Sequence, residues 1–397
     1  MDAHPYARQI RFLLQSALLI FAYTVVIGIL NGTDLVDFGF KTLLTHVHTG
    51  TLGWITTSVF AAALWLFGTT PTTGWRDSLP RSLPYVTVLL VVAYNGAFLA
   101  TTGSLRPTVG GAVLLVILAW VVWIFASAKS SVLSVPRLGI LAAITTLTLG
   151  GLLGVLLGVM LATGNDILPG DAYAAHPATM VIGFLIPVGM ALAEWNLRPD
   201  LLEQRVTRSG WLQIGLPFVG GLFVTAGLLA DSAPLISVSL PFEIIGVGIF
   251  VKRMWPGLRS VDRNSAGSAF VAAPTALWLV LDIAFLVYLI VRFEGDFDSV
   301  RVGLILALDH MMFIGVMTNS LFAQVRAARP ELKPTAIRVL SYAMNLGLAG
   351  FVLGLLADTA ILKQISTPIM GLGILHGIAL FTLALHRREP TPNAQVA

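Results

Sequence analysis

The sequence predicts an all-α, polytopic membrane protein with about twelve transmembrane helices. Hydrophobic residues make up 56% of the 397 positions and charged residues only 11%, whereas a soluble domain has about 25% charged residues. The mean hydropathy is +0.85. Apolar runs of about 20 residues, long enough to cross the hydrocarbon core as helices, recur along the whole chain. Residues 1–397 are therefore predicted to form a single transmembrane domain with no soluble domain.

Each predicted helix is an apolar run bounded by charged or turn-forming residues. The first run follows a polar N-terminus at full length, which favours a retained span over a cleaved signal peptide. The twelve helices are expected at about 10–31, 44–68, 82–102, 109–128, 137–162, 173–195, 210–230, 233–251, 271–292, 302–325, 335–358 and 366–386.

The basic residues support this count and give it an orientation. With the N-terminus inside, 19 of the 24 Lys and Arg residues fall in cytoplasmic segments. The outer loops keep five, namely Lys41, Arg106, Arg292, Arg301 and Lys363. This alternation follows the positive-inside rule. We expect a multi-pass protein of a bacterial-type inner membrane, in contact with the lipid bilayer, with both termini in the cytoplasm.

Composition also limits the chemistry. The chain has no cysteine, which excludes disulfides, thiolate metal sites, iron–sulfur clusters and covalently attached c-type haem. Any bound metal would therefore need His, Met, Tyr or carboxylate ligands. The net charge of +4 comes from helix ends, with no basic run interleaved with aromatic residues, so no nucleic-acid partner is expected.

Five of the seven histidines lie within apolar segments, all on even-numbered helices that begin at the outer face: His46, His48, His176, His310 and His376. A lone membrane histidine is usually explained by a hydrogen bond to nearby backbone or hydroxyl groups. Three of these five start roughly 8–14 Å below the nearest outer charge, and polar groups gathered in one layer of the membrane indicate function. Neutral imidazole binds haem iron and copper, so the candidate metal ligands are His46, His176, His310 and His376.

The second helix carries small residues beneath a histidine. His46, Gly50, Gly53 and Thr57 follow helical spacing and would form one stripe, while His48 would point to the opposite side. Such a stripe suits either a flat porphyrin or close packing of a neighbouring helix. The candidate cofactor-binding residues are His46, His48, His310, Gly50 and Gly53.

Three short segments suggest an internal repeat. THVHTGTLGW, AHPATMVIGF and LDHMMFIGVM each place a histidine five or seven residues ahead of a glycine. His46, His176 and His310 are 130 and 134 residues apart, which matches three pseudo-repeated units of four helices.

These segments also resemble known families. HVHTGTLGW resembles the second helix of haem–copper oxidase subunit I and, equally, the NnrS family, haem- and copper-containing membrane proteins linked to nitric oxide stress. DHMMFIGVMTNSLFAQV resembles a stretch of the NnrS family. In the oxidase fold, twelve helices form three arcs with ligands on helices 2, 6 and 10. The matching positions here are His46 or His48, His176 and His310.

The sequence departs from the oxidase pattern at its copper site. The seventh helix has no histidine, the tenth has only His310, and no tyrosine lies one helical turn after His176. The NnrS-like resemblance therefore fits better. The histidines are too few for two haems and a three-histidine copper site, so we predict one haem b, ligated by His310 and His46, with His176 and His376 available for copper or for gating. The protein would handle nitric oxide, another small gas or electrons from a donor; whether it is an enzyme stays open.

Two other function classes stay open. One is a secondary transporter in which Glu243 and Asp282, on adjacent helices, couple an ion, although such residues also serve as helix–helix hydrogen bonds. The other is a non-catalytic assembly subunit of a respiratory complex. A Soret band in the purified protein would favour the haem-binding class.

Overall fold

The computed structural model describes residues 4–69, 72–101, 103–293 and 297–387. Within these residues it contains twelve helical spans that are long and apolar enough to cross a membrane, and no strand. The predicted all-α polytopic fold is thereby confirmed. Spans 1, 3, 4 and 5 are α1 (Ala7–Gly32), α4 (Trp75–Ala100), α5 (Leu105–Ala128) and α6 (Val135–Thr163). Spans 7, 8, 9, 11 and 12 are α9 (Arg208–Leu229), α10 (Ala233–Arg259), α11 (Ser268–Arg292), α14 (Pro334–Leu356) and α15 (Ala360–His386).

Spans 2, 6 and 10 each contain a π-helical segment between two α-helices. Span 2 runs through α2 (Phe40–His48), η1 (Thr49–Thr56) and α3 (Thr57–Phe67); span 6 through α7 (Ala172–Ala178), η2 (Thr179–Leu185) and α8 (Ile186–Leu197); span 10 through α12 (Val302–His310), η5 (Met311–Thr318) and α13 (Asn319–Ala328). Wide π turns are rare and occur mostly at functional sites. Their occurrence in every fourth span supports the three-unit repeat.

Spans 2 and 6 form the interior of the bundle, and span 10 contacts both of them. Spans 2 and 6 are the most buried, at 78% each, against 28–50% for the others, among them span 10 at 44%. Segment η5 contacts both η1 and η2. At this centre the indole Nε1 of Trp54 in η1 donates a hydrogen bond of 3.2 Å to Thr318 Oγ1 in η5.

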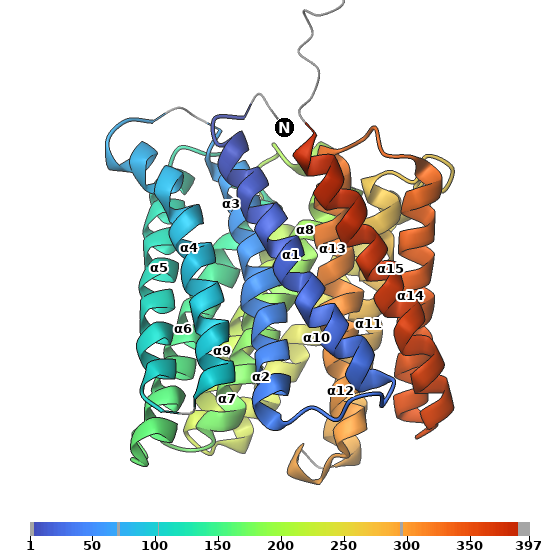
Figure 1. Cartoon of the computed structure of the whole chain (residues 1–397). Coiled ribbons are helices and arrows are strands. Elements are labelled where there is room, and N and C mark those ends of the chain that lie inside the picture. The colour runs from blue at the N-terminus through green and yellow to red at the C-terminus, as the bar shows by residue number, and fades with distance from the viewer. Residues whose placement is uncertain (1–3, 70–71, 102, 294–296, 388–397) are drawn as a thin grey trace, which may run out of the picture.

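The other nine spans surround this core and follow the repeat. In each unit the third span packs against the fourth, as α4 against α5, α9 against α10 and α14 against α15. The last span returns to the first, since α15 packs along α1 (Figure 1). We refer to spans 1–4, 5–8 and 9–12 as units 1, 2 and 3.

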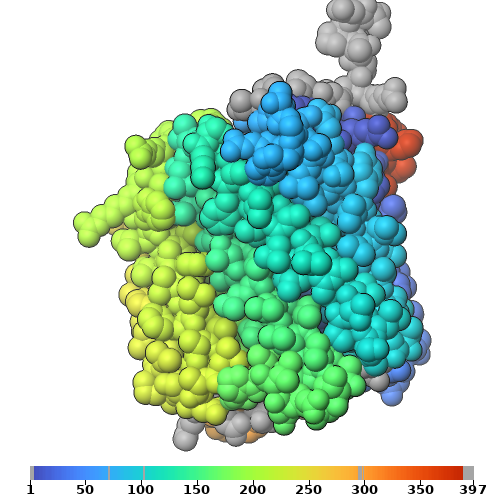
Figure 2. Space-filling model, turned by 90° about the vertical axis from the view of Figure 1, so that its left-hand side faces the viewer, coloured from blue at the N-terminus to red at the C-terminus, as the bar shows by residue number. Residues whose placement is uncertain are grey.

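The outward faces are apolar, as contact with lipid requires. Figure 2 shows one side of the bundle, covered by helices of units 1 and 2. Large side chains exposed on α5, α6 and α10 include Leu115, Val122, Leu152 and Ile245. Broad exposed apolar surface of this kind marks a membrane-facing protein.

The helix ends differ from the predicted boundaries where charged residues remain helical. The eighth helix was expected to end at residue 251 but continues to Arg259, because Arg253 is anchored by an ion pair of 2.6 Å with the buried Glu194. The described N- and C-terminal ends lie at the same end of the bundle, opposite α2, α7 and α12 (Figure 1).

Labelling of single cysteines tests the orientation directly, because the natural chain has none. We expect Asp166→Cys, on the exposed α6–α7 loop, to react with an impermeant maleimide on intact cells. Arg205→Cys, on the exposed loop before α9, should react only after permeabilisation. The reverse pattern of labelling would contradict the orientation.

Candidate functional site

A large pocket opens between unit 3 and unit 1 and contains two of the predicted ligands. It has an empty volume of about 870 Å³, including its open mouth, and is lined by α1, span 2, span 10, α14 and α15. Most of its wall is apolar, with Phe21 stacked on Trp54 at a centroid distance of 4.9 Å. His46 and His310 enter it from two different spans. We call this cavity the His46/His310 pocket.

His46 is fixed by the preceding span. Its ring Nδ1 lies 3.0 Å from the carbonyl oxygen of Thr24 on α1. A carbonyl can only accept, so Nδ1 carries the proton and Nε2 keeps a free lone pair for a ligand. Gly28 lies one turn further along α1, where a Cβ would come within 3.3 Å of His46 Cε1. The ring thus rests on backbone and a glycine.

His310 is fixed by its own helix. Its Nδ1 lies 2.7 Å from the carbonyl oxygen of Leu306, one turn earlier, and its ring packs on Phe351 of α14 at a centroid distance of 4.7 Å. The same argument leaves Nε2 as the unprotonated nitrogen. Both histidines of the pocket therefore have the tautomer that metal-ligating imidazoles adopt when a carbonyl holds the other nitrogen.

His48 and His176 lie outside this pocket, at the boundary between units 1 and 2. The ring of His48 stacks on Phe98 of α4, with centroids 4.2 Å apart, and its Nδ1 lies 2.8 Å from the carbonyl oxygen of Leu44. The Nδ1 of His176 lies 2.8 Å from the carbonyl oxygen of Gly150 on α6. Span 2 thus directs His46 and His48 to different boundaries.

His376 lies apart from all four. It is exposed on α15, and its Nε2 lies 3.3 Å from the carbonyl oxygen of Ala336 at the other end of the bundle from α12. In the described part of the chain, no three His, Cys, Asp or Glu side chains gather as a metal site. The four predicted metal ligands are therefore not brought to one point.

The two glycines singled out in span 2 both face α1. A Cβ on Gly50 would come within 3.4 Å of Thr24 Cγ2, and one on Gly53 within 2.3 Å of Ile20 Cγ2. Gly50 also lines the His46/His310 pocket. Because His46 bonds to the carbonyl of Thr24 on the same helix, the predicted stripe of His46, Gly50 and Gly53 is kept and packs against α1.

Polar residues that the sequence placed inside spans divide into two groups. Asn319 and Asn345 exchange hydrogen bonds of 2.9 and 3.0 Å, and Trp278 Nε1 donates to Asn345 Oδ1 at 2.8 Å, which ties spans 9, 10 and 11 together. Glu243 and Asp282 are buried, and each leaves one carboxylate oxygen without a partner in the described structure.

The mouth of the pocket carries an ion pair. Lys363, one turn before the lining residue Thr367, donates to Asp34 at 2.7 Å, and this hydrogen bond lowers the pKa of Asp34 below its ordinary value. This contact fastens the loop after α1 to the start of α15.

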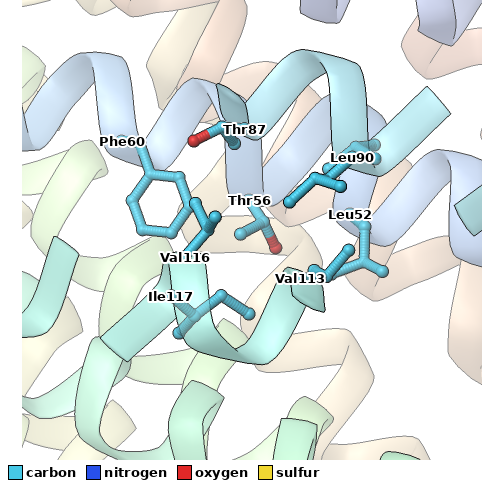
Figure 3. A pocket seen from close by; sticks show the side chains of 9 residues that line it. Leu52, Thr56, Phe60, Thr87, Leu90, Val113, Val116 and Ile117 are labelled. Carbon is cyan, nitrogen blue, oxygen red and sulfur yellow. The ribbon is translucent and has the colours of Figure 1, made fainter. Parts of the chain in front are cut away.

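A second, smaller void lies inside unit 1 (Figure 3). Its empty volume is about 240 Å³, and Leu52, Phe60, Val113 and Ile117 are among the side chains that surround it. Its only polar lining groups are the hydroxyls of Thr56 and Thr87. It contains no ionisable side chain and is a packing defect rather than a candidate site.

Several neighbours of the histidines give no signal in the sequence. Phe98 and Phe351 are ordinary apolar residues of long helices, and Arg106 was counted as an outer-loop charge although only 5% of it is exposed.

No family model matches the chain, and no curated protein matches it.

Proposed function

We propose that the protein is a haem-binding integral membrane protein of the NnrS-like kind, in which the His46/His310 pocket holds a b-type haem. The observation that carries the proposal is the pair of imidazoles entering one apolar pocket, each with Nδ1 on a backbone carbonyl. The short motifs around His46 and His310 support it through their resemblance to NnrS sequences.

The residues of the pocket suit this group. Its walls are mostly apolar and aromatic, with Asp309 as the one carboxylate among the lining residues, and Gly28, Gly50 and Gly371 also line it. Thr24, Thr51 and Thr367 supply hydroxyls at its wall. When bound, the haem supplies one-electron chemistry or a site for a small gas.

The chain determines which of these uses is open. If both Nε2 atoms bound the iron, no position would be free for a gas, and the site would favour electron transfer. A gas such as nitric oxide would then have to take the place of one imidazole. Each ring is held by a carbonyl at Nδ1 and by a contact with another span, Gly28 of α1 for His46 and Phe351 of α14 for His310.

The experiment is an absorption spectrum of the protein purified in mild detergent after expression with a haem supply. We expect a Soret band and, after reduction, the sharp α band of a six-coordinate b haem. The His376→Ala variant should give the same spectrum. Purified, folded protein without a Soret band would overturn the proposal.

Ion-coupled transport is the second candidate, and one observation favours it. Glu243 and Asp282 lie buried on adjacent spans, each with an unpaired oxygen that could bind a cation or a proton. Uptake of sodium or protons into proteoliposomes, reduced by Asp282→Asn, would support transport. Such uptake by haem-free protein would favour it over the haem proposal.

A further inference from the structure

The three π-helical segments allow the sequences of the three units to be aligned with one another. Each has a central glycine packed on the preceding span: Gly53 against Ile20, Gly183 against Thr146 and Gly315 against Trp278, where a Cβ would come within 2.3–2.9 Å. Aligned on these glycines, His46 and His176 stand seven residues before, and His48 and His310 stand five residues before.

The two histidines at the seven-before position are held in the same way. His46 reaches the carbonyl of Thr24, four residues after Ile20, and His176 reaches the carbonyl of Gly150, four residues after Thr146. One turn later each ring meets a glycine, Gly28 for His46 and Gly154 for His176.

The two histidines at the five-before position also match. His48 and His310 each place Nδ1 on the carbonyl four residues earlier in their own helix, at 2.8 and 2.7 Å. Each ring then packs on a phenylalanine of the following span, Phe98 on α4 and Phe351 on α14. Four histidines thus form two classes with two members each.

The pairing of the classes repeats as well. His46 of unit 1 and His310 of unit 3 line the same pocket between those units. At the next boundary, the ring of His48 meets Tyr94 edge-on at a centroid distance of 5.9 Å. A Cβ on Gly110 would touch both Tyr94 and Val155, and Val155 follows Gly154, the glycine that meets the ring of His176 of unit 2. Each boundary therefore pairs one five-before histidine with one seven-before histidine.

A buried cation lies at the second boundary. The guanidinium of Arg106 at the start of α5 lies over Phe98, 4.0 Å from the ring centroid, and Nη2 donates to the Phe98 carbonyl at 3.2 Å. The residue is 5% exposed, and its Nε has no partner in the described structure. An unpaired guanidinium nitrogen beside His48 suits a carboxylate, the group that a haem presents at its edge.

We propose that His48 and His176 are the axial ligands of a second haem, held between units 1 and 2 with Arg106 as partner of a propionate. This inference rests on the proposed haem function, and it replaces the expected single haem by two. The sequence predicted a single haem, with His176 available for copper or for gating and no partner for His48. The alignment of the three units pairs His48 with His176.

The boundary between units 2 and 3 has no histidine at either of the two aligned positions. Between units 2 and 3 the five-before residue is Ala178 and the seven-before residue is Leu308. The residue four after Trp278, which corresponds to Thr24 and Gly150, is the buried Asp282. No imidazole pair is available there, so two haems and not three are expected.

The experiment is the ratio of haem to protein, measured as the pyridine haemochrome, in detergent-purified chain. We expect two haems in the wild type, and one each in His48→Ala, His176→Ala and His310→Ala. The His48→Ala/His310→Ala double variant should have none. Monodisperse elution verifies folding, and added imidazole should restore the missing haem to variants that only lack a ligand.

The outcomes separate the two proposals. One haem that is lost in His310→Ala but unchanged in His48→Ala and His176→Ala overturns the second site alone. Folded protein without haem overturns the proposed function and with it this inference. Copper that depends on His48 and His176, beside a single unchanged haem, also overturns the second haem.

A glycine pair gives a sharper test without removing a ligand. A Cβ on Gly154 would come within 2.8 Å of His176 Cε1, whereas one on Gly111 of α5 meets nothing within 4 Å. We expect Gly154→Ala to lower occupancy of the second haem at least about tenfold, and Gly111→Ala to leave both haems in place. Equal, full haem content in the two variants would contradict the assigned ring position.

Discussion

We expect the His310→Ala variant to lose the haem that we propose for the His46/His310 pocket. The substitution removes one of the two imidazoles, and the residues that line the pocket include no further His or Tyr and one Met, Met370 of α15. Losing a ligand of this kind lowers affinity by at least about tenfold to a hundredfold. The measurement is the Soret absorbance per protein after size-exclusion chromatography.

His376→Ala is the matched control for this loss. It removes an imidazole of equal size from the same membrane protein, but from an exposed face of α15 outside the pocket. It should retain the full haem content. If His310→Ala keeps the same Soret absorbance as His376→Ala, His310 is not a ligand.

The Glu194→Ala variant is strongly destabilised. The Glu194 side chain is 1% exposed, pairs with Arg253 Nη2 at 2.6 Å and accepts from Gln213 Nε2 at 3.0 Å, joining spans 6, 7 and 8. Removing it takes away the only carboxylate bonded to a largely buried guanidinium, which keeps hydrogen bonds to the uncharged Gln213, Thr207 and Ser209. Breaking a buried ion pair in this way costs about 3–5 kcal/mol. Thermal unfolding in detergent, followed by tryptophan fluorescence, should show a clearly lower midpoint.

Glu203→Ala provides the comparison for that result. Glu203 also pairs with an arginine, Arg137 at 3.0 Å, but its side chain is 70% exposed. Arg137 keeps hydrogen bonds to the carbonyls of Leu66 and Val132 after the substitution. Replacing Glu203 with alanine should lower the free energy of unfolding by about 1 kcal/mol or less. Equal midpoints for the two variants would show that burial of Glu194 contributes little.

The fold was predictable from the sequence because the membrane imposes it. Length of apolar runs and placement of Lys and Arg are local properties, and they located all twelve spans. The π segments were not predictable, since an extra residue per turn leaves no compositional mark. Nor could the sequence show that Gly50 and Gly53 both pack on α1, with Gly50 also lining the pocket.

The candidate site was predictable only as a set of residue types. The sequence identified the histidines and their common layer, but partner choice depends on which units become neighbours. His46 and His48, two residues apart, face different boundaries, and neither direction follows from spacing alone. Arg106 has the sequence pattern of a loop charge, and only the packing of α4 against α5 buries it beside Phe98.

Electron paramagnetic resonance of the oxidised protein tests most directly whether two imidazoles coordinate the haem that we propose for the His46/His310 pocket. We use the His48→Ala variant, in which only the His46/His310 pocket should be filled. Two imidazole ligands predict a low-spin ferric signal, which His46→Ala, made in the same background, converts to high-spin or removes. A high-spin signal in the His48→Ala variant, or a low-spin signal unchanged by His46→Ala, would contradict the account.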